Sequence, residues 1–395
     1  MPQEAHHIHS VLSPPIVAIA RYASEHASTN RQLISFGQGL PFFGPPQFAL
    51  DQLGPKLNSS ASALHRYSPD EGLAELREEL LLHHRQEVPN LQGGVLVTAG
   101  ANQAIFTTLA TILNPGDEVL VPTPYYFNSV MAVQILRAKP VFVPRQPNFD
   151  LDIPALEAAV NDRTKAVIIT SPDNPTGAVY PRRSMELVYD LAVKHDLWLL
   201  HDETYRDFLF AENSRHFSAT ALEPELERVV GLYSFSKAYG MAGHRLGYCL
   251  YPQSLAESLV KVQDTLVVCP PVPAQHLALT LLRQNQTQSW LVDQLLELAK
   301  VRSFVLRELA SLGSLSLPDD SLSGHGGFYV FPELTSDRFA SADEFVKALI
   351  REEGVVFLPG DAFGPHWGGH VRLAFGNVSM EQAQEGFARM NRFFL

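Results

Sequence analysis

A lysine in a glycine- and serine-rich stretch has the surroundings expected of a covalent nucleophile. Residues 234–248 include Ser234, Ser236, Lys237 and Arg245. Lys237 has small and aromatic neighbours and no acidic residue close by, so desolvation would favour its neutral amine. The serine hydroxyls and Arg245 can donate to a phosphate, and the glycines let the backbone approach it. The stretch therefore predicts an amine that attacks a carbonyl beside a phosphate. A glycine-rich loop with an incidental surface lysine explains the stretch alone about equally well.

Seven short apolar runs, separated by helical patterns, supply the elements that must position this lysine. The runs are 95–98, 119–121, 141–143, 166–170, 198–200, 229–233 and 246–250. Continuous apolar strands alternating with helices predict an α/β fold with a mostly parallel seven-stranded sheet, covered by helices on both faces. In such sheets a ligand lies beyond the carboxyl ends of the strands.

The residues that follow these runs carry complementary chemistry. A helix start at 100–104 offers free backbone N–H groups to an anion. The next runs are followed by aromatic rings at 125–127, by a proline-fixed loop at 171–177 that includes Asn174, and by Asp202 and Tyr205. Each feature alone is ordinary turn chemistry. Because all of them lie at one predicted sheet edge, we expect a single site there.

The remaining segments predict a second, smaller α/β region. Residues 13–30 have the pattern of an amphipathic helix, and 290–312 that of one long helix that leads to the C-terminal part. The turn 69–72 is expected to open a helix with Asp70 and Glu71 in its first turn. In the C-terminal part, strands are expected at 326–331, 354–358 and 371–376, and helices at 342–351 and 380–393.

Arg372 lies in the middle of the apolar run 371–376. A buried, unpaired guanidinium is costly, so Arg372 is expected to meet an anion, and a structural salt bridge is the alternative.

Composition excludes several classes of protein. The chain has 395 residues, of which 46% are apolar and 18% charged, as in a folded enzyme. Its 30 basic and 42 acidic residues give a net charge of −12, which argues against binding to nucleic acid. No apolar run reaches the length of a membrane span, and residues 1–10 do not resemble a secretory signal. Two cysteines fit a cytoplasmic protein, and no metal site is predicted, since His6, His7 and His9 fit a frayed terminus better.

These motifs together resemble the class I/II aminotransferases of fold type I, which depend on pyridoxal 5'-phosphate. The resemblance runs from about residue 13 to the end, and its most specific part is the S-x-S-K-x5-G-x-R-x-G pattern at 234–247. The stretches VTAGANQA, PYYFNS, SFSKAYGM and KVQD are most similar to the plant-type aromatic and methionine aminotransferases. The family's domain pattern implies an N-terminal segment of the small domain at 13–48, a large cofactor-binding domain at 49–296 and a C-terminal small domain at 297–395.

The resemblance also implies roles for the catalytic residues. Lys237 would bind the cofactor aldehyde as a Schiff base and then move the substrate proton. Asp202 would keep the pyridine nitrogen protonated, which makes the ring an electron sink. Tyr205 and Asn174 would donate hydrogen bonds to the phenolic oxygen of the ring, and Tyr126 would stack on its face.

Further residues are implied to hold the phosphate and the substrate. The phosphate group would be bound by Gly100, Ala101, Asn102, Ser234, Ser236 and Arg245. Tyr67 would reach the phosphate of a neighbouring subunit, so the active unit should be a homodimer. Arg372 would bind the substrate α-carboxylate as a fork, aided by Asn174, Gly39 and Leu40.

The substrates are expected to be an L-amino acid and a 2-oxo acid, exchanged by a ping-pong mechanism through pyridoxamine phosphate. The segments 38–43, 125–128 and 265–271 contain no arginine or lysine that could bind a distal carboxylate. An aromatic or methionine-like donor is therefore expected, with an aspartate-type aminotransferase or a C–S lyase of the same fold as alternatives. ACC synthases and acyl-CoA-condensing synthases share this fold and lysine.

Two other classes fit the sequence less well. A cofactor-binding regulatory module would need an N-terminal DNA-binding domain, for which about a dozen residues are too few. A nicotinamide dehydrogenase would need a GxGxxG motif after a strand, and the glycines at 37 and 39 lead into prolines instead.

Overall fold

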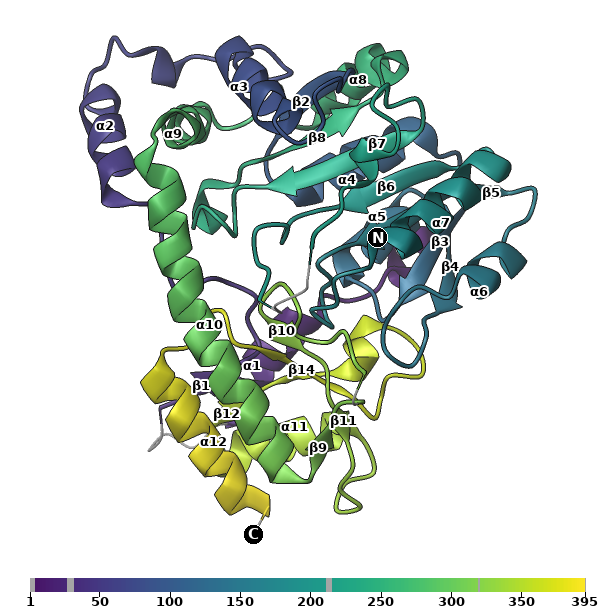
Figure 1. The fold of residues 1–395 in the computed structure, drawn as a ribbon, viewed down its shortest axis with the longest axis vertical. Helices are drawn as coiled ribbons and strands as arrows, with labels where there is room; N and C mark the ends of the chain where they lie inside the picture. The colour runs from purple at the N-terminus through teal and green to yellow at the C-terminus, as the bar shows by residue number, and fades with distance from the viewer. Residues whose placement is uncertain (1–3, 27–31, 211–214, 319, 395) are drawn as a thin grey trace.

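A seven-stranded sheet organises the larger part of the molecule (Figure 1). The computed structural model describes residues 4–26, 32–210, 215–318 and 320–394. The strands are β2 (Gly94–Thr98), β3 (Glu118–Thr123), β4 (Lys139–Pro144), β5 (Thr164–Thr170), β6 (Trp198–Asp202), β7 (Val229–Ser234) and β8 (Gly247–Tyr251). Their order is β2-β8-β7-β6-β5-β3-β4, and only β8 runs antiparallel to its neighbours. The predicted α/β fold with a mostly parallel sheet is confirmed.

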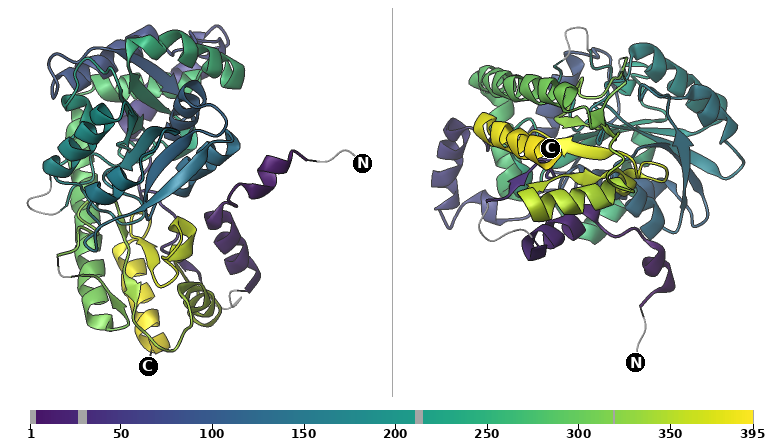
Figure 2. Two further views of the ribbon diagram at one scale, coloured as in Figure 1. Left: turned by 90° about the vertical axis from the view of Figure 1, so that its right-hand side faces the viewer. Right: turned by 90° about the horizontal axis from the view of Figure 1, so that it is seen from below.

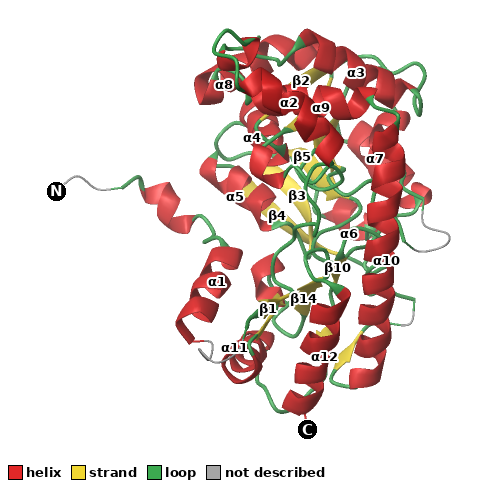
Figure 3. Cartoon of the chain, turned by 90° about the vertical axis from the view of Figure 1, so that its left-hand side faces the viewer, coloured by secondary structure: helices red, strands yellow, loops and turns green. Residues whose placement is uncertain are grey.

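Helices cover this sheet because most of its strands are apolar on both faces. All five residues of β2 and of β8 are buried, and β6 is buried apart from its first residue. The helices of this part are α2 (Gln47–Leu57), α3 (Ala74–Arg85), α4 (Ala101–Ile112), α5 (Phe127–Ile135), α6 (Ile153–Ala158), α7 (Arg182–Lys194), α8 (Ala256–Val267) and α9 (Val272–Arg283). Figure 3 shows α2, α3, α8 and α9 gathered at the end of the molecule that holds β2.

The long helix α10 (Gln286–Leu312) leads from the sheet to a smaller C-terminal region, as expected from its sequence (Figure 1). That region contains α1 (Pro15–His26), α11 (Ala342–Glu353), α12 (Met380–Phe394), β1 (Ile34–Ser35), β9 (Leu315–Ser316), β10 (Tyr329–Val330), β11 (Glu333–Leu334), β12 (Val355–Val356), β13 (Leu358–Pro359) and β14 (Val371–Ala374). Since β1 pairs with β12, the N-terminal segment joins this region (Figure 2). The expected domain limits at residues 48 and 296 remain a prediction.

Short 3-10 helices complete the described secondary structure. They are η1 (His6–Ser10), η2 (Ala63–His65), η3 (Ala219–Ala221), η4 (Ala242–His244), η5 (Gln253–Leu255) and η6 (Gly360–Phe363). Among the helices of the described residues, none is both long and apolar enough to cross a bilayer.

Two expectations about local structure are wrong. Asp70 and Glu71 do not lie in the first turn of α3, because Gly72 has a φ of +99° and the helix begins only at Ala74. In place of the strand expected over 326–331, the structure has only the two-residue strand β10, because the φ of Gly327 is +63°, a value outside the range of extended strands. In both places a glycine with a positive φ interrupts the expected element.

Candidate active site

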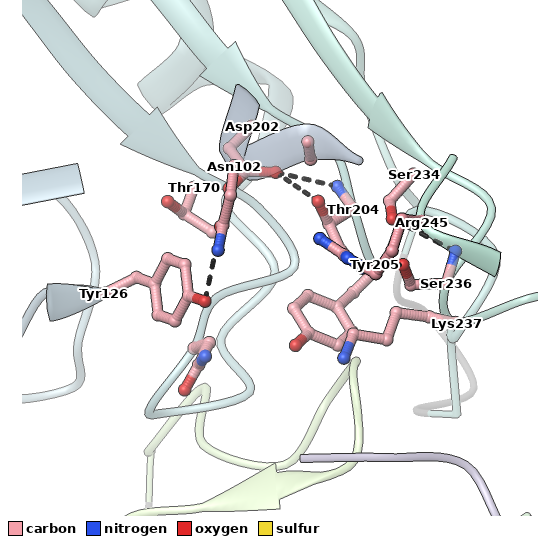
Figure 4. Close-up of a pocket in the computed structure, with 12 residues that line it drawn as sticks. Asn102, Tyr126, Thr170, Asp202, Thr204, Tyr205, Ser234, Ser236, Lys237 and Arg245 are labelled. Atoms are coloured by element: carbon pink, nitrogen blue, oxygen red, sulfur yellow. Dashed lines mark hydrogen bonds between the residues drawn. The ribbon is translucent and has the colours of Figure 1, made fainter. Parts of the chain in front are cut away.

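A polar cavity lies at the carboxyl ends of β3, β5, β6 and β7, where a parallel sheet places its ligands (Figure 4). Together with its opening to solvent, it contains about 510 Å³ of empty space. The lining residues are Ala101, Asn102, Tyr126, Thr170, Asn174, Asp202, Thr204, Tyr205, Ser234, Ser236, Lys237 and Arg245.

Lys237 projects into this cavity from the loop after β7 (Figure 4). The loop is anchored by the buried Phe235, whose backbone N–H donates to the carbonyl of Leu246. The Lys237 Nζ donates to the carbonyl oxygen of Gly39 at 2.6 Å. Burial lowers the pKa of Lys237 to about 8, and the positive charge of Arg372 acts in the same direction. A large fraction of this amine is therefore neutral near pH 8 and can act as a nucleophile.

Asp202 ends β6 and is buried at the back of the cavity. Its Oδ1 accepts hydrogen bonds from the Thr204 backbone N–H at 3.0 Å and from the Thr204 hydroxyl at 2.6 Å. Burial raises the pKa of Asp202, and the two bonds from Thr204 partly offset this effect. Its Oδ2 accepts no hydrogen bond from the described residues. The carboxylate is thus held in a fixed orientation and can accept one more donor from a ligand.

An anion cradle lies at the start of α4. The helix begins at Ala101 with no side chain capping it, so its first N–H groups are available to a ligand. Gly100 has a φ of +87°, and a Cβ there would lie 2.6 Å from an Arg245 guanidinium nitrogen. The Arg245 guanidinium donates to the Ala242 carbonyl at 3.1 Å and lies 3.5 Å from the Ser236 hydroxyl. No carboxylate of the described residues pairs with Arg245, so its charge is available to an anion.

Tyr126 closes the side of the cavity at the end of β3 (Figure 4). Its hydroxyl accepts a hydrogen bond from Asn128 Nδ2 at 2.7 Å and lies 3.5 Å from Asn102 Oδ1. These contacts fix the position of the ring, whose face is then available for stacking by a planar ligand.

Arg372 lies beside the cavity on β14 and is only 1% exposed. One of its terminal nitrogens donates to Asn174 Oδ1 at 2.8 Å, and the other donates to the carbonyl of Gly37 at 2.5 Å. Its Nε is buried and has no hydrogen-bond partner among the described residues. No carboxylate of the described residues pairs with Arg372, so the structural salt bridge considered from the sequence is not found among them. A buried guanidinium with an unpartnered N–H can bind a ligand anion.

A buried ion pair shapes the loop that carries Asn174. Arg145 donates to both oxygens of Asp173, at 2.9 and 3.0 Å, and both side chains are at most 3% exposed. Asp173 also accepts from the Thr176 hydroxyl at 2.6 Å. Charge-assisted bonds of this kind are strong and directional, so the loop presents Asn174 in one orientation.

Tyr205 lines the cavity and contacts a residue that the sequence did not identify as functional. Its hydroxyl oxygen is 2.6 Å from that of Tyr329, which comes from β10 in the C-terminal region. Burial raises the pKa of Tyr205 well above its ordinary value, and that of Tyr329 to about 12. Both side chains are therefore neutral hydroxyls at physiological pH.

The structure brings most of the sequence-predicted site residues together. Ten of the twelve residues expected to bind the cofactor line the cavity. Gly100 is not a lining residue but lies next to the guanidinium of Arg245, which is one. Tyr67 is not a lining residue either, and 84% of its surface is exposed. Gly39 and Arg372 border the cavity through Lys237 and Asn174, whereas no described contact links the Leu40 side chain to it.

Sequence reasoning missed Thr170, Thr204 and Tyr329. The first two lie at or just after strand ends, so the rule on carboxyl ends could have found them. No sequence pattern identified Tyr329, because a tyrosine within an apolar run is typical of the hydrophobic core. Among the described residues, no group of three or more His, Cys, Asp or Glu side chains is arranged to hold a metal ion.

Comparison with known proteins identifies the family. A model of the aminotransferases of class I and II matches residues 31–390. An aromatic-amino-acid aminotransferase of Thermococcus litoralis is 33% identical over 91% of each chain, and an aspartate aminotransferase of Pyrococcus abyssi is 33% identical over 93% of this chain and 92% of its own.

A plant relative and a solved structure agree with this. An aromatic aminotransferase of Arabidopsis thaliana is 32% identical over 91% of this chain and 89% of its own. The structure of an aspartate aminotransferase of Thermus thermophilus in complex with maleate superposes with a TM-score of 0.90 at 29% identity, over all of both chains. The predicted family is confirmed: this chain belongs to the class I and II aminotransferases and is a transaminase.

Proposed function

We propose that this transaminase uses pyridoxal 5'-phosphate to move the amino group of a neutral, aromatic or methionine-like L-amino acid to a 2-oxo acid, in two ping-pong half-reactions. One observation carries the proposal: a buried lysine with a lowered pKa shares one cavity with a fixed aspartate, and two nearby arginines, Arg245 and Arg372, pair with no carboxylate of the described residues. An aldehyde, a ring nitrogen, a phosphate and a substrate carboxylate match these four groups.

The residues present fit the cofactor. The uncapped start of α4, Ser234, Ser236 and Arg245 form a donor set for a phosphate dianion. Gly100 keeps this cradle open, since a larger residue there would collide with Arg245. When bound, pyridoxal phosphate supplies an electron-withdrawing ring that stabilises the negative charge left when the substrate loses its α-proton.

Each side chain of the cavity has a separate task in this proposal. Asp202, oriented by Thr204, accepts a hydrogen bond from the ring nitrogen and holds its proton there. Tyr126 packs against the ring face, and Tyr205 and Asn174 donate to its phenolic oxygen. Since Arg372 occupies Asn174 Oδ1, the amide nitrogen of Asn174 remains available as a donor. Lys237 holds the cofactor and, once released, carries the proton between substrate and cofactor carbon.

Arg372 binds the α-carboxylate. Its contacts with Asn174 and Gly37 fix the plane of the guanidinium, and its remaining N–H groups form the fork that a carboxylate requires. The carboxylate would then also lie near Lys237, whose Nζ donates to Gly39 at the same side of the cavity.

The preference for a neutral donor rests on three segments that the sequence predicts to face the substrate side chain. The segments 38–43, 125–128 and 265–271 provide aromatic and aliphatic side chains and no arginine or lysine. A carboxylate at the distal end of aspartate would lack a cationic partner from these segments and would lose solvation without compensation. The relatives named aspartate aminotransferases keep aspartate as a second candidate donor.

A substrate panel tests this preference. We expect kcat/KM for phenylalanine, tryptophan or methionine to exceed that for aspartate by about tenfold or more, because an unpaired buried carboxylate costs at least about 1.4 kcal/mol. A clear advantage for aspartate over all three would refute the preference while leaving the transaminase intact.

The active unit is proposed to be a homodimer, with Tyr67 donating to the phosphate bound by the second subunit. Tyr67 is 84% exposed, which is unusual for a large aromatic side chain. Leu266, Val267 and Val268 are also exposed, and a second subunit would cover such surfaces. We also propose a cytoplasmic location. The two cysteines, Cys249 and Cys269, form no disulfide, as is usual in a reducing compartment.

A further inference from the structure

Tyr329 connects the C-terminal region to the candidate active site. It lies on β10, paired with Ala374 of β14, and is 1% exposed. The Tyr329 hydroxyl oxygen lies 2.6 Å from the hydroxyl oxygen of Tyr205, a residue that follows β6 of the large sheet. The Tyr329 side chain therefore ends at a residue that lines the cavity.

Two further parts of the site pack directly against Tyr329. The guanidinium carbon of Arg372 lies 4.8 Å from the centre of the Tyr329 ring, in a cation–π contact. Residue 39 must be glycine at this point, because a Cβ would lie 2.0 Å from the Tyr329 hydroxyl oxygen. The hydroxyl is therefore enclosed where the carboxylate-binding arginine, the Gly39 backbone and Tyr205 converge.

The number of hydroxyl hydrogens decides the direction of the bond between the two tyrosines. Each hydroxyl carries one hydrogen and can also accept. Tyr205 can donate into the cavity only if it does not donate to Tyr329. Tyr329 has no other hydrogen-bond partner among the described residues, so its hydrogen is available to Tyr205. A Tyr205 hydroxyl that accepts from Tyr329 is both aimed and polarised towards the cavity.

We propose that Tyr329 is a positioning residue of the transamination reaction: its hydroxyl donates to Tyr205 and directs the Tyr205 hydrogen to the phenolic oxygen of the bound cofactor, while its ring supports Arg372. This inference rests on the proposed use of pyridoxal phosphate. It adds a residue of the small region to the cofactor's hydrogen-bond network and couples that network to the carboxylate site.

Other charged and titratable groups face this pair and bear on any titration. Arg372 on β14 and Tyr126 before α5 lie close enough to affect both hydroxyls, and Asp202 affects that of Tyr329. The Lys237 Nζ lies 5.8 Å from the centre of the Tyr205 ring. Since all of these side chains are present in both proteins, wild type and the Tyr329→Phe variant differ in sequence only by the Tyr329 hydroxyl.

The test is a pH titration of the visible absorbance of the purified holoenzyme. Donors to the phenolic oxygen stabilise its negative charge, so weakening them raises the pH at which the bound chromophore loses its proton. We expect Tyr205→Phe to raise this midpoint by about 1 to 2 pH units, since it removes a bond to a charged oxygen. Tyr329→Phe should raise it by about 0.1 to 0.7 unit, since it removes only the polarising bond.

Two further variants make the result specific. In the Tyr205→Phe background, Tyr329→Phe should leave the midpoint unchanged, because the hydroxyl it acts through is gone. Tyr180→Phe is the matched control, since Tyr180 is 1% exposed and its hydroxyl has no hydrogen-bond partner among the described residues. Should Tyr329→Phe fail to fold, 3-fluorotyrosine at position 329 is a stronger donor of nearly the same size and should lower the midpoint.

The outcomes separate the inference from the function it rests on. A wild-type protein that develops no visible chromophore with pyridoxal phosphate would refute the proposed cofactor. A chromophore that responds to Tyr205→Phe but not to either change at Tyr329 would refute the inference alone. A shift by Tyr329→Phe that persists without the Tyr205 hydroxyl would also refute it, because the effect would then not pass through Tyr205.

Discussion

Replacing Arg372 by lysine tests whether the guanidinium fork binds the substrate. Lysine keeps the positive charge but offers one nitrogen in place of a planar fork. In the structure the two terminal nitrogens of Arg372 bond Asn174 and Gly37, and the buried Nε has no partner among the described residues. The variant should lose one charge-assisted bond to the carboxylate as well as the contacts that orient the group.

The magnitude follows from the energy of such bonds. One hydrogen bond to a charged group contributes about 1.5 to 3 kcal/mol, which corresponds to a factor of about 10 to 150 in kcat/KM. For Arg372→Ala, the loss of two such bonds, about 3 to 6 kcal/mol, predicts a fall of about 10² to 10⁴. The alanine variant also leaves the Gly37 carbonyl and Asn174 without their donor, so its thermal stability should fall.

Steady-state kinetics and ligand binding measure this effect. The Kd for 3-phenylpropanoate should rise by about the factor by which kcat/KM falls. The Kd for the uncharged 3-phenylpropanamide should change little. Arg389→Lys is the matched control, because Arg389 on α12 is also buried but, among the described residues, donates to Glu385 and to backbone carbonyls. If Arg372→Lys kept kcat/KM and the Kd of the carboxylate within threefold of wild type, the assignment of Arg372 would be refuted.

Two other predictions concern the cofactor. Burial lowers the pKa of Lys237 to about 8. The rate at which pyridoxal phosphate attaches covalently to the cofactor-free protein, followed by absorbance, should therefore rise about tenfold per pH unit below pH 8 and level off above it. A rate that still rises towards pH 10 would contradict the lowered pKa. Arg245→Ala should raise the Kd for pyridoxal phosphate about 10- to 150-fold, while kcat at saturating cofactor stays close to that of the wild type. The control variant Arg283→Ala, which removes an ion pair with Glu79, should change neither the Kd nor kcat. An Arg245 variant that lost kcat while retaining its affinity would assign this arginine to the chemistry instead.

The sheet could be predicted from the sequence because its strands are buried on both faces. A strand such as β2 or β8 then reads as a continuous apolar run, which is easily separated from the helices between runs. The position of Asp202 and Lys237 at one sheet edge followed from the same pattern. The C-terminal strands are only two to four residues long and shorter than the apolar runs that contain them. In one such run, Gly327 turns the chain and ends the extended backbone.

The contacts between distant segments could not be predicted. Arg372 and Asn174 are 198 positions apart, and Tyr205 and Tyr329 are 124 apart. No local pattern sets such pairs, which depend on how the C-terminal region packs against the sheet. The sequence indicated that Arg372 needs an anion, but not that Asn174 and Gly37 leave its Nε unpartnered. Tyr329 lacked even that indication, since an uncharged ring in an apolar run is ordinary core.

A single-turnover reaction tests the central claim most directly. The holoenzyme is mixed with phenylalanine in the absence of any 2-oxo acid, and the visible spectrum, the 2-oxo acid and free ammonia are measured together. Amino transfer predicts one equivalent of phenylpyruvate per active site, a matching loss of the visible band, no ammonia, and recovery of the band when a 2-oxo acid is added. A visible band that persists with no phenylpyruvate formed would contradict the account. Repeated release of ammonia from a thioether amino acid such as methionine, without any acceptor, would identify a C–S lyase instead.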